Sequence, residues 1–401
     1  MRIGMMADVY KPHISGITNY ISLNKQFLEK NGHEVFVFTF SEDEEYHDDE
    51  QNVIRSPGLP LLDTGYYISL RYTPYARKLL HTMDVAHVHH PFLSGSLALL
   101  YCRQQAVPII FTNHTRYDLY SRAYLPPMAD FLGLAAVKAY LPSFCRSCDL
   151  VISPSPGMRE VLVEFGVDVP IDVVPNGVDL EPFKSPVESA RRAELGFGES
   201  DIILVYVGRL GPEKNLPFLL RAFSGTVQAY RNTRLLLIGD GPERDTLEEL
   251  VSRSGISDCV RFLGAVEYKD LPIYLSFADA FVTASVTEVH PLTVIEAMAA
   301  GLPVLGICSP GISDTVEDEV TGLLSAEEDL ASFTAKMVRL VREHGLRKEM
   351  GENARKASAE FAIERTIDLI EERYERVIIK AKSRKRGMRV RFSRWVESMR
   401  R

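Results

Sequence analysis

Short apolar runs alternate with longer amphipathic stretches along most of the chain. In the first half, runs typical of buried strands occupy residues 1–7, 32–40, 107–112, 149–153 and 171–175. Residues 18–31, between the first two runs, have the spacing of a helix. A short apolar run followed by a helical pattern is typical of a βαβ unit in a parallel sheet. The pattern therefore predicts an α/β fold.

This alternation stops near residues 180–200 and then begins again. The interruption is charged, and the segment 181–186 contains two prolines, which is typical of a linker. Further strand-like runs follow at 202–207, 233–238, 259–264, 278–285 and 304–307. Two such series predict two Rossmann-like, doubly wound domains. We expect them at residues 1–185 and 186–370, with 371–401 as a C-terminal helix and basic tail returning to the first domain or to a membrane.

The segment 284–305 holds the strongest candidate chemistry. Pro291 suits the first turn of a short helix, and Gly301 suits its end. Glu288 precedes this helix and Glu296 lies inside it, about 9 Å further along the axis at about 1.5 Å per residue. Each carboxylate can accept two sugar hydroxyls. The alternative is an ordinary helix with one acidic residue near its N-terminus and another on its exposed face.

The loop between the two glutamates adds backbone groups to this candidate site. First-turn N–H groups have no partner inside a helix, and the helix dipole favours anions beside them. Ligands of doubly wound sheets bind beyond the carboxyl ends of the strands, where this loop is expected. The positions expected to contact phosphate or sugar oxygens here are Val289, His290, Pro291, Leu292 and Thr293.

Two cations follow the strand at 202–207. Arg209 and Lys214 could neutralise a diphosphate, the first as a planar fork and the second as a point charge. In the first half, Gly16 precedes a helix and lets the backbone approach a phosphate, although its loop lacks the spacing of dinucleotide or ATP motifs. His114 ends another strand, where it could bind a sugar hydroxyl or stabilise a developing charge.

Composition narrows the range of partners. The chain has 401 residues and a net charge of −8, so it is not built as a whole to bind nucleic acid. A zinc site needs about four ligands. The candidate ligands fall short of this and are Cys145 with Cys148, and His87, His89 and His90. We therefore predict no metal and no cofactor, and we interpret the acidic segment 41–50 as a solvated surface loop.

Several motifs together resemble the retaining family 4 glycosyltransferases of GT-B fold. These motifs are Gly208-Arg209 with Lys214, Gly239-Asp-Gly241-Pro, Pro175-Asn-Gly-Val-Asp179, and the Glu288/Glu296 pair followed by Ala297-Met-Ala-Ala-Gly301. The resemblance covers nearly the whole chain. It implies two Rossmann-like domains that face each other across a cleft, the first binding an acceptor and the second a nucleotide-sugar donor.

The resemblance also implies roles for the candidate residues of the second domain. Arg209 and Lys214 would bind the donor diphosphate. Glu288 would hold the hydroxyls of the donor sugar, and Glu296 would hold the ribose. The departing diphosphate would then be stabilised by these two cations and by helix N-termini, without a divalent ion.

In the first domain, the resemblance implies that His114 contacts the sugar near the reacting carbon and that Gly16 lies close to the diphosphate. The loop 289–291 departs from the family's usual small or aromatic residue followed by glycine, so the donor sugar stays open. No second carboxylate is placed as a nucleophile. The resemblance therefore implies front-face transfer with retention, in which the leaving phosphate assists removal of the acceptor proton.

Two segments suggest a lipid acceptor. Residues 113–120 are similar to those of bacterial diacylglycerol glucosyltransferases, and the acceptor-binding candidates here are Arg116, Tyr117, Tyr120 and Tyr124. Residues 380–401 carry ten lysines and arginines against one acid. A basic helix with a tryptophan suits an anionic membrane, and its expected contacts are Lys385, Arg386, Arg389, Arg391 and Trp395. A solvated tail and an RNA-binding tail are the alternatives.

The combined hypothesis is a metal-independent, retaining hexosyltransferase. We expect UDP-glucose as donor and a membrane lipid as acceptor, such as diacylglycerol or a phosphoinositide-like lipid. No leader-like segment precedes the first strand and no apolar run approaches about 20 residues, so we expect a cytoplasmic protein, peripheral on the inner face of the cell membrane. Three alternatives stay open: a transferase using GDP-mannose or a soluble acceptor such as a sugar phosphate, a sugar-phosphate isomerase or epimerase, and a non-catalytic nucleotide-sugar sensor.

Overall fold

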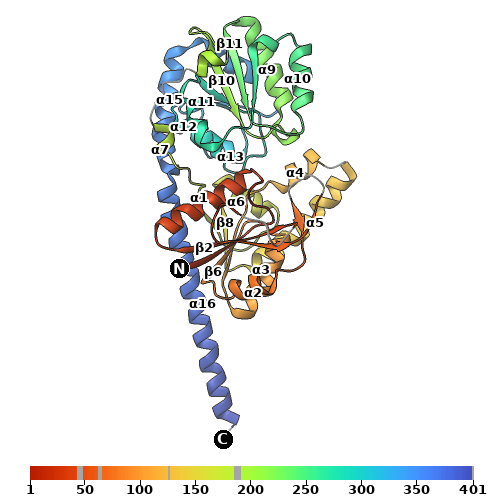
Figure 1. The fold of residues 1–401 in the computed structure, drawn as a ribbon, viewed down its shortest axis with the longest axis vertical. Helices are drawn as coiled ribbons and strands as arrows, with labels where there is room; N and C mark the ends of the chain where they lie inside the picture. Colours follow the sequence, from red (N-terminus) through yellow and green to blue (C-terminus); the bar gives the residue numbers. More distant parts are fainter. Residues whose placement is uncertain (43–47, 62–65, 125–126, 185–190, 400–401) are drawn as a thin grey trace.

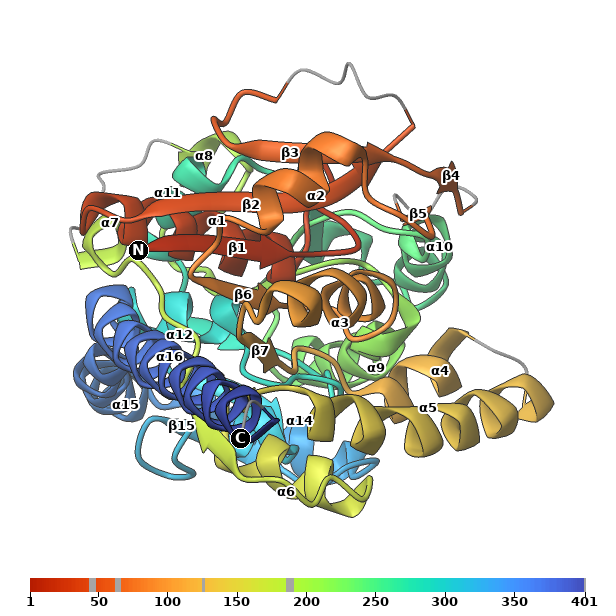
Figure 2. The ribbon, with the colours of Figure 1, turned by 90° about the horizontal axis from the view of Figure 1, so that it is seen from below.

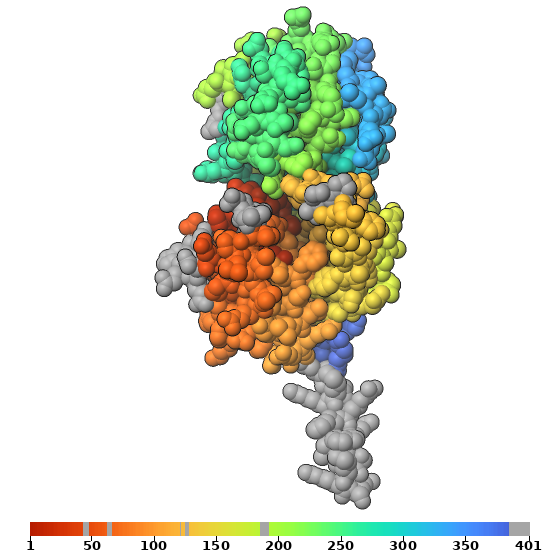
Figure 3. All heavy atoms as spheres, turned by 90° about the vertical axis from the view of Figure 1, so that its right-hand side faces the viewer, coloured from red at the N-terminus to blue at the C-terminus, as the bar shows by residue number. Residues whose placement is uncertain are grey.

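The computed structural model describes residues 1–42, 48–61, 66–124, 127–184 and 191–399. Two α/β domains lie one above the other, and the chain returns from the second to the first along the helix α16 (Ile363–Met399) (Figure 1). In the space-filling view the two lobes meet at a narrow waist (Figure 3). The architecture is GT-B, with two Rossmann-like halves.

The first domain contains a sheet of seven parallel strands in the order β3-β2-β1-β6-β7-β8-β9. The strands are β1 (Arg2–Met6), β2 (Glu34–Ser41), β3 (Val53–Pro57), β6 (Val85–Val88), β7 (Ile109–Thr112), β8 (Leu150–Ser153) and β9 (Ile171–Val173). A two-stranded hairpin, β4 (Leu59–Pro60) with β5 (Tyr67–Ile68), follows β3. The central strands are apolar on both faces because helices cover both faces of a parallel sheet.

Alternate residues of these strands pack against different helices. Met6 and Phe38 join the core formed with α2 (Pro74–Leu80), α3 (Leu93–Gln105), α5 (Pro127–Ser147) and α6 (Pro156–Glu164). Met5 and Val37 instead face α1 (Gly16–Lys30) and α16. The short helix α4 (Tyr117–Tyr124) lies before α5, at the edge that faces the second domain (Figure 1).

The second domain repeats this plan with six parallel strands in the order β12-β11-β10-β13-β14-β15. The strands are β10 (Ile202–Val207), β11 (Thr233–Ile238), β12 (Val260–Gly264), β13 (Ala280–Val282), β14 (Val304–Ile307) and β15 (Gly322–Ser325). The α-helices are α7 (Glu181–Lys184), α8 (Arg191–Glu194), α9 (Leu216–Ala229), α10 (Arg244–Arg253), α11 (Leu271–Ser276), α12 (Leu292–Ala299), α13 (Pro310–Ser313), α14 (Leu330–Arg342) and α15 (His344–Ser358). The 3₁₀ turns are η2 (Pro212–Lys214), η3 (Ser257–Cys259), η4 (Tyr268–Asp270) and η5 (Ala359–Phe361).

Strand order reverses once in each sheet, and these two points position the site. In the first sheet β1 lies between β2 and β6, and in the second β10 lies between β11 and β13. The loops that follow the two neighbouring strands leave in opposite directions, so a crevice opens at their carboxyl ends. The turn after β10 in the second domain contacts α4 of the first domain, where the two domains meet (Figure 1).

The helix α16 belongs to the first domain by its packing, although it follows the second domain in the chain. It lies beside α1 (Figure 2) and buries Ile367, Ile370, Tyr374 and Val377 in the first domain's core. The Tyr374 hydroxyl also hydrogen-bonds His87 Nδ1 at 2.7 Å. One helix therefore ties the end of the second domain to the first.

Beyond this contact, α16 continues away from the first domain (Figure 1). The expected membrane contacts Lys385, Arg386, Arg389, Arg391 and Trp395 lie on this helix, in a part whose side chains are outside the described residues. Among the helices that the structure describes, none is long and apolar enough to cross a membrane.

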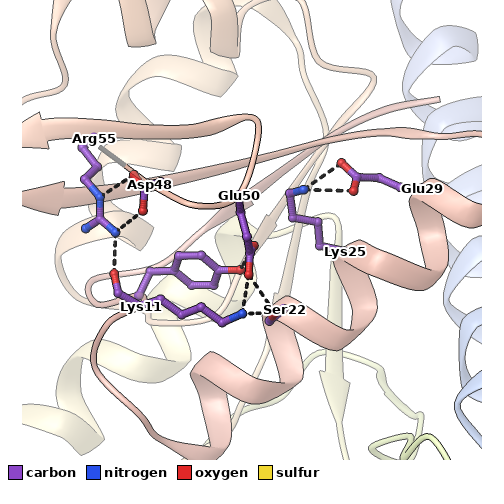
Figure 4. A network of polar contacts seen from close by, with 8 residues as sticks. Lys11, Ser22, Lys25, Glu29, Asp48, Glu50 and Arg55 are labelled. Carbon is purple, nitrogen blue, oxygen red and sulfur yellow. Dashed lines mark hydrogen bonds and ion pairs between the residues drawn. The ribbon is translucent and has the colours of Figure 1, made fainter. Parts of the chain in front are cut away.

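In the acidic segment 41–50, residues 43–47 lie outside the described residues, and the described acids Asp48 and Glu50 are not simply solvated. Asp48 pairs with Arg55 at 2.6 Å, and Glu50 pairs with Lys11 and accepts a hydrogen bond of 2.7 Å from the Tyr10 hydroxyl (Figure 4). These contacts fix the loop between β1 and α1, because Lys11 and Tyr10 belong to it. The expectation of a purely solvated segment was wrong for Asp48 and Glu50, since both carboxylates face cations that the folded chain brings to them.

The docking of α16 predicts a selective loss of stability. Ile370 is 1% exposed and Ile379, on the same helix, is 65% exposed. Ile370→Ala should lower the free energy of unfolding by about 2–5 kcal/mol, since it leaves a cavity. Ile379→Ala should change it by no more than about 0.5 kcal/mol. Urea denaturation measures both, and equal losses would contradict this packing.

Candidate functional site

An ion pair lies where β10 and β13 end side by side. Lys214, in the turn η2 after β10, places its Nζ 2.7 Å from Glu288 Oε1, in the loop after β13. The two side chains are only 19% and 20% exposed. Strand order brings them together, because β10 and β13 are neighbours although Lys214 and Glu288 are 74 residues apart.

Each partner keeps the other charged. Burial works against the ammonium of Lys214, but the attraction of Glu288 outweighs it and raises the pKa of Lys214. Burial would likewise raise the pKa of Glu288, but the attraction of Lys214 and hydrogen bonds from Lys214 and Ser285 outweigh it and lower that pKa. A fixed cation and a fixed carboxylate therefore stand side by side at neutral pH.

The loop after Glu288 is held by contacts with α13, Asn176 and Phe361. A Cβ added to Gly311, in α13, would meet the Glu288 carbonyl oxygen at 2.4 Å, so only glycine lets α13 approach this loop. Asn176, in the connection after the first domain, donates a hydrogen bond of 2.9 Å from Nδ2 to the His290 carbonyl. The His290 ring packs edge-on against Phe361, with ring centroids 5.0 Å apart.

The start of α12 leaves backbone donors toward the cleft. Pro291 is the N-cap of this helix and makes no side-chain capping bond. The first N–H groups of a helix have no acceptor within it. Among the described residues, no protein acceptor is found for the N–H groups of Val289, His290, Leu292 and Thr293. These donors lie beside Glu288 and can hold an anion or a hydroxyl oxygen.

Glu296 is buried within α12 and is 3% exposed. Burial raises its pKa to about 7, and a hydrogen bond with Tyr268 opposes part of that rise. Tyr268, in the turn η4, is 42% exposed, so the partner of this buried carboxyl reaches the solvent. Glu296 is thus a carboxyl that changes charge near neutral pH, as hydroxyl-binding carboxylates at a ligand site can do.

Arg209 follows β10 and is exposed. The loop after β11 packs on the backbone of the next residue, since a Cβ added to Gly241 would meet the Leu210 carbonyl oxygen at 2.5 Å. Across the cleft, the ring of Tyr124 in α4 lies under the Arg209 guanidinium, 5.9 Å from ring centroid to Cζ. Arg209 therefore stands between the two domains rather than on an outer surface.

The loop after β1 forms the opposite wall. Gly16 is the first residue of α1, and Ser15 caps this helix by accepting from the Thr18 N–H. A Cβ added to Gly16 would meet nothing within 4 Å, so this helix start is open. Burial lowers the pKa of His13, in the same loop, and the charge of Arg209 lowers it further. The helix start of the first domain and Arg209 of the second therefore face the same space.

His114 follows β7 and joins a cluster of histidines. Its Nε2 lies 3.1 Å from His89 Nδ1, and its ring lies 4.7 Å from the ring of Tyr20 in α1. Burial first, and the neighbours His87 and His90 next, hold the pKa of His114 well below its usual range. His114 is thus a neutral imidazole whose position is set by His89.

The four acceptor candidates have different surroundings. Arg116 forms an ion pair with Asp118 at 2.7 Å, and Tyr117 packs edge-on against Phe92. Tyr120 and Tyr124 stack on each other with ring centroids 5.5 Å apart. Burial raises the pKa of Tyr120, and the charges of Glu213, Lys214, Arg209 and Glu288 act on it. These two tyrosines therefore face the charged loops of the second domain.

Together these groups suit a ligand with two negative charges and several hydroxyls. Arg209, Lys214 and the two helix starts supply positive potential, and Glu288 and Glu296 supply acceptors for hydroxyls. In the part of the chain that the structure describes, no three His, Cys, Asp or Glu side chains are placed to hold a metal ion.

Comparison with known proteins gives the family. Residues 14–182 match the family described as Glycosyltransferase Family 4, and residues 187–357 match Glycosyl transferases group 1. The chain is 31% identical to the alpha-monoglucosyldiacylglycerol synthase of Acholeplasma laidlawii, over 80% of this chain and 84% of that protein. It is 30% identical to the enzyme of the same name from Streptococcus pneumoniae, over 82% and 77%.

The chain belongs to the GT-B glycosyltransferases. Solved structures agree on the fold: the sucrose-phosphate synthase of Thermosynechococcus elongatus gives a TM-score of 0.78 at 24% identity, covering 94% of this chain and 99% of that one. Anabaena Alr3699/HepE in complex with UDP and glucose gives 0.73 at 20% identity, covering 94% and 99%.

The structure of this glycosyltransferase also shows contacts that the sequence did not suggest. Asn176 supports the His290 backbone, His89 holds His114, and Glu213 accepts a hydrogen bond of 2.6 Å from the Tyr124 hydroxyl. Asn176 lies within the Pro175-Asn-Gly motif and His89 within the three-histidine segment. The sequence therefore singled out both residues, but it did not indicate which residues they contact. Glu213 carried no signal beyond its place before Lys214.

The raised pKa of Glu296 predicts a pH-dependent stability. A carboxyl with a higher pKa in the folded state costs stability as pH rises from about 4.5 to about 7, and the cost is complete above pH 7. Glu296→Gln should therefore stabilise the protein at pH 8 by up to about 3 kcal/mol and little at pH 5. Thermal unfolding at both pH values measures this. The exposed Glu352→Gln is the control, and a shift for Glu296→Gln that does not change with pH would contradict the prediction.

Proposed function

We propose that this glycosyltransferase moves a hexose from a nucleotide-sugar to a membrane lipid with retention of configuration. The observation that carries the proposal is the pair Lys214–Glu288, set between Arg209 and the open start of α12. A cation, a sugar-binding carboxylate and free N–H groups lie within one crevice. A diphosphate joined to a sugar presents groups that complement these: negative oxygens for the cation and the N–H groups, and hydroxyls for the carboxylate.

The donor is proposed to lie across this crevice. Its diphosphate contacts Arg209, Lys214 and the start of α1 at Gly16. Its sugar contacts Glu288 and the 289–293 backbone, and its ribose contacts Glu296, about one turn from the start of α12. UDP-glucose is the favoured donor, because Anabaena Alr3699/HepE was solved with UDP-glucose and the two synthases described above are named for glucosyl transfer.

Transfer is proposed to proceed on one face of the sugar. The bond between the anomeric carbon and the diphosphate oxygen breaks while the acceptor oxygen bonds to the same face. The acceptor proton passes to the departing phosphate oxygen. Arg209 and Lys214 stabilise the negative charge that develops on this oxygen, so a divalent ion is not needed. His114, neutral and held by His89, contacts the sugar near the reacting carbon.

A lipid acceptor is supported by the relatives and by the tail. Both alpha-monoglucosyldiacylglycerol synthases are named for a product on diacylglycerol. The sequence from residue 380 to residue 401 is strongly basic, which suits an anionic surface. We therefore propose diacylglycerol as acceptor and the inner face of the cell membrane as the site of action.

Donor turnover tests the proposal. Purified protein in EDTA receives UDP-glucose or GDP-mannose, with and without anionic vesicles containing diacylglycerol, and released nucleotide is measured. We expect vesicle-dependent release of UDP from UDP-glucose, lost in Glu288→Ala. Turnover with a soluble acceptor alone would support instead the class of the D-inositol 3-phosphate glycosyltransferase of Frankia alni, which is 32% identical over 69% of this chain. Tight nucleotide binding without any turnover would indicate a sensor.

The two cations should both contribute to the rate of transfer. Arg209→Met or Lys214→Met should lower kcat by about 10²–10³, since each removes a group that stabilises the departing diphosphate. Lys269→Met changes an exposed lysine of the same domain and is the control. Steady-state kinetics with saturating donor measures the effect, and a kcat within threefold of the control for both variants would contradict the assigned role.

The basic end of α16 should act through the membrane. Replacing Lys385, Arg386, Arg389 and Arg391 together by glutamine removes four charges and keeps the length of the chain. Each lysine or arginine near an anionic surface contributes about 1 kcal/mol at most, so vesicle binding should weaken by about tenfold or more. Sedimentation with anionic vesicles measures it, and vesicles of neutral lipid are the control. Unchanged binding would contradict a membrane role for this segment.

A further inference from the structure

One side chain of the first domain reaches the donor-phosphate loop of the second. The Tyr124 hydroxyl, at the end of α4, donates a hydrogen bond of 2.6 Å to Glu213 Oε2 in the turn η2. The same ring lies under the Arg209 guanidinium at 5.9 Å, within the range of a cation–π contact. Tyr124 thus contacts two residues, Arg209 and Glu213, of the loop that leads from β10 to α9.

Glu213 has an unusual environment for a carboxylate. It is 3% exposed, and among the described residues its Oε1 has no hydrogen-bond partner. Its backbone carbonyl accepts from Thr287 Oγ1 at 3.3 Å, the residue before Glu288. A buried carboxylate with one satisfied oxygen depends strongly on the donor that it has. That donor comes from the other domain.

The turn η2 therefore links α4 of the first domain to the loop after β13 through two consecutive residues. Glu213 faces Tyr124 and Thr287, and Lys214 faces Glu288. Tyr120 stacks on Tyr124 from the preceding turn of α4, with an angle of 24° between the rings. Stacking limits the freedom of the Tyr124 ring, so the ring presents both its face and its hydroxyl in a fixed direction.

We propose that Tyr124 is a positioning residue that reaches across the cleft to hold Arg209 and Glu213, and through them Lys214, in the arrangement that binds the donor diphosphate. This inference rests on the proposed function. It replaces the expected role of Tyr124 as an acceptor contact. The first domain then affects donor binding through a single tyrosine, in addition to any contact of its own with the donor.

Binding of UDP to the full chain tests this without knowledge of the acceptor. Isothermal calorimetry is applied to the wild type, Tyr124→Phe, Tyr124→Leu and the control Tyr75→Phe, which changes an exposed tyrosine of the same domain. Tyr124→Phe should weaken UDP binding about threefold to tenfold, since it leaves Glu213 Oε2 without its hydrogen-bond donor. Tyr124→Leu should weaken it about tenfold or more, because the ring face is lost as well. Tyr75→Phe should stay within twofold of the wild type.

A second variant separates positioning from a general loss of structure. Glu213→Gln replaces the buried carboxylate by a neutral amide. Added to Tyr124→Phe, it should raise the UDP affinity, and this gain should be larger than the change that Glu213→Gln causes in the wild type. Thermal unfolding checks that each variant is folded. If Tyr124→Leu does not fold, the UDP affinity of Tyr124→Phe alone decides the test.

The outcomes are distinct. If the wild type binds UDP and both Tyr124 variants bind it with an affinity within twofold of the wild type, the inference is overturned and the proposed function stands. A raised KM for the acceptor with unchanged UDP affinity would return Tyr124 to the acceptor site and overturn it as well. A wild type that binds no nucleoside diphosphate would overturn the proposed function and this inference together.

Discussion

The ion pair of Lys214 and Glu288 is the interaction on which the candidate site depends. Two charges that are about four-fifths buried need each other, because either one alone would carry an uncompensated cost. The order of the parallel strands brings the two residues together, because β10 and β13 are neighbours and end side by side. Each is then already charged, fixed and partly shielded from water before any ligand arrives. Preorganised charge of this kind acts more strongly on a reaction than the same groups in water.

The rest of the fold holds this pair against the first domain. The connection at Asn176 supports the loop after Glu288, and its neighbour Val178 pairs with Ala362 just before α16. The helix α16 then crosses to the first domain and binds His87 through Tyr374. The chain therefore passes between the domains twice at one place. This arrangement sets the separation of the two crevices, and with it the distance from Arg209 to the start of α1.

Much of this could be predicted from the sequence, because parallel sheets have continuous apolar strands and present their ligand groups at strand ends. Arg209, Lys214, Glu288 and Glu296 stand one loop or one turn beyond such strands. The pairing of Glu213 with Tyr124 could not be predicted, since 89 residues separate them and the contact depends on how the domains meet. The ion pairs of the acidic segment 41–50 were missed for a similar reason: charge runs look the same in a sequence with or without a folded partner.

The most direct test of this account is a crystal structure of the protein with UDP-2-deoxy-2-fluoroglucose, a donor that resists transfer. The account predicts the diphosphate between Arg209, Lys214 and the N-terminus of α1, the sugar hydroxyls on Glu288 and the ribose on Glu296. A nucleotide bound elsewhere, or bound in this crevice with its diphosphate away from Arg209 and Lys214, would contradict it.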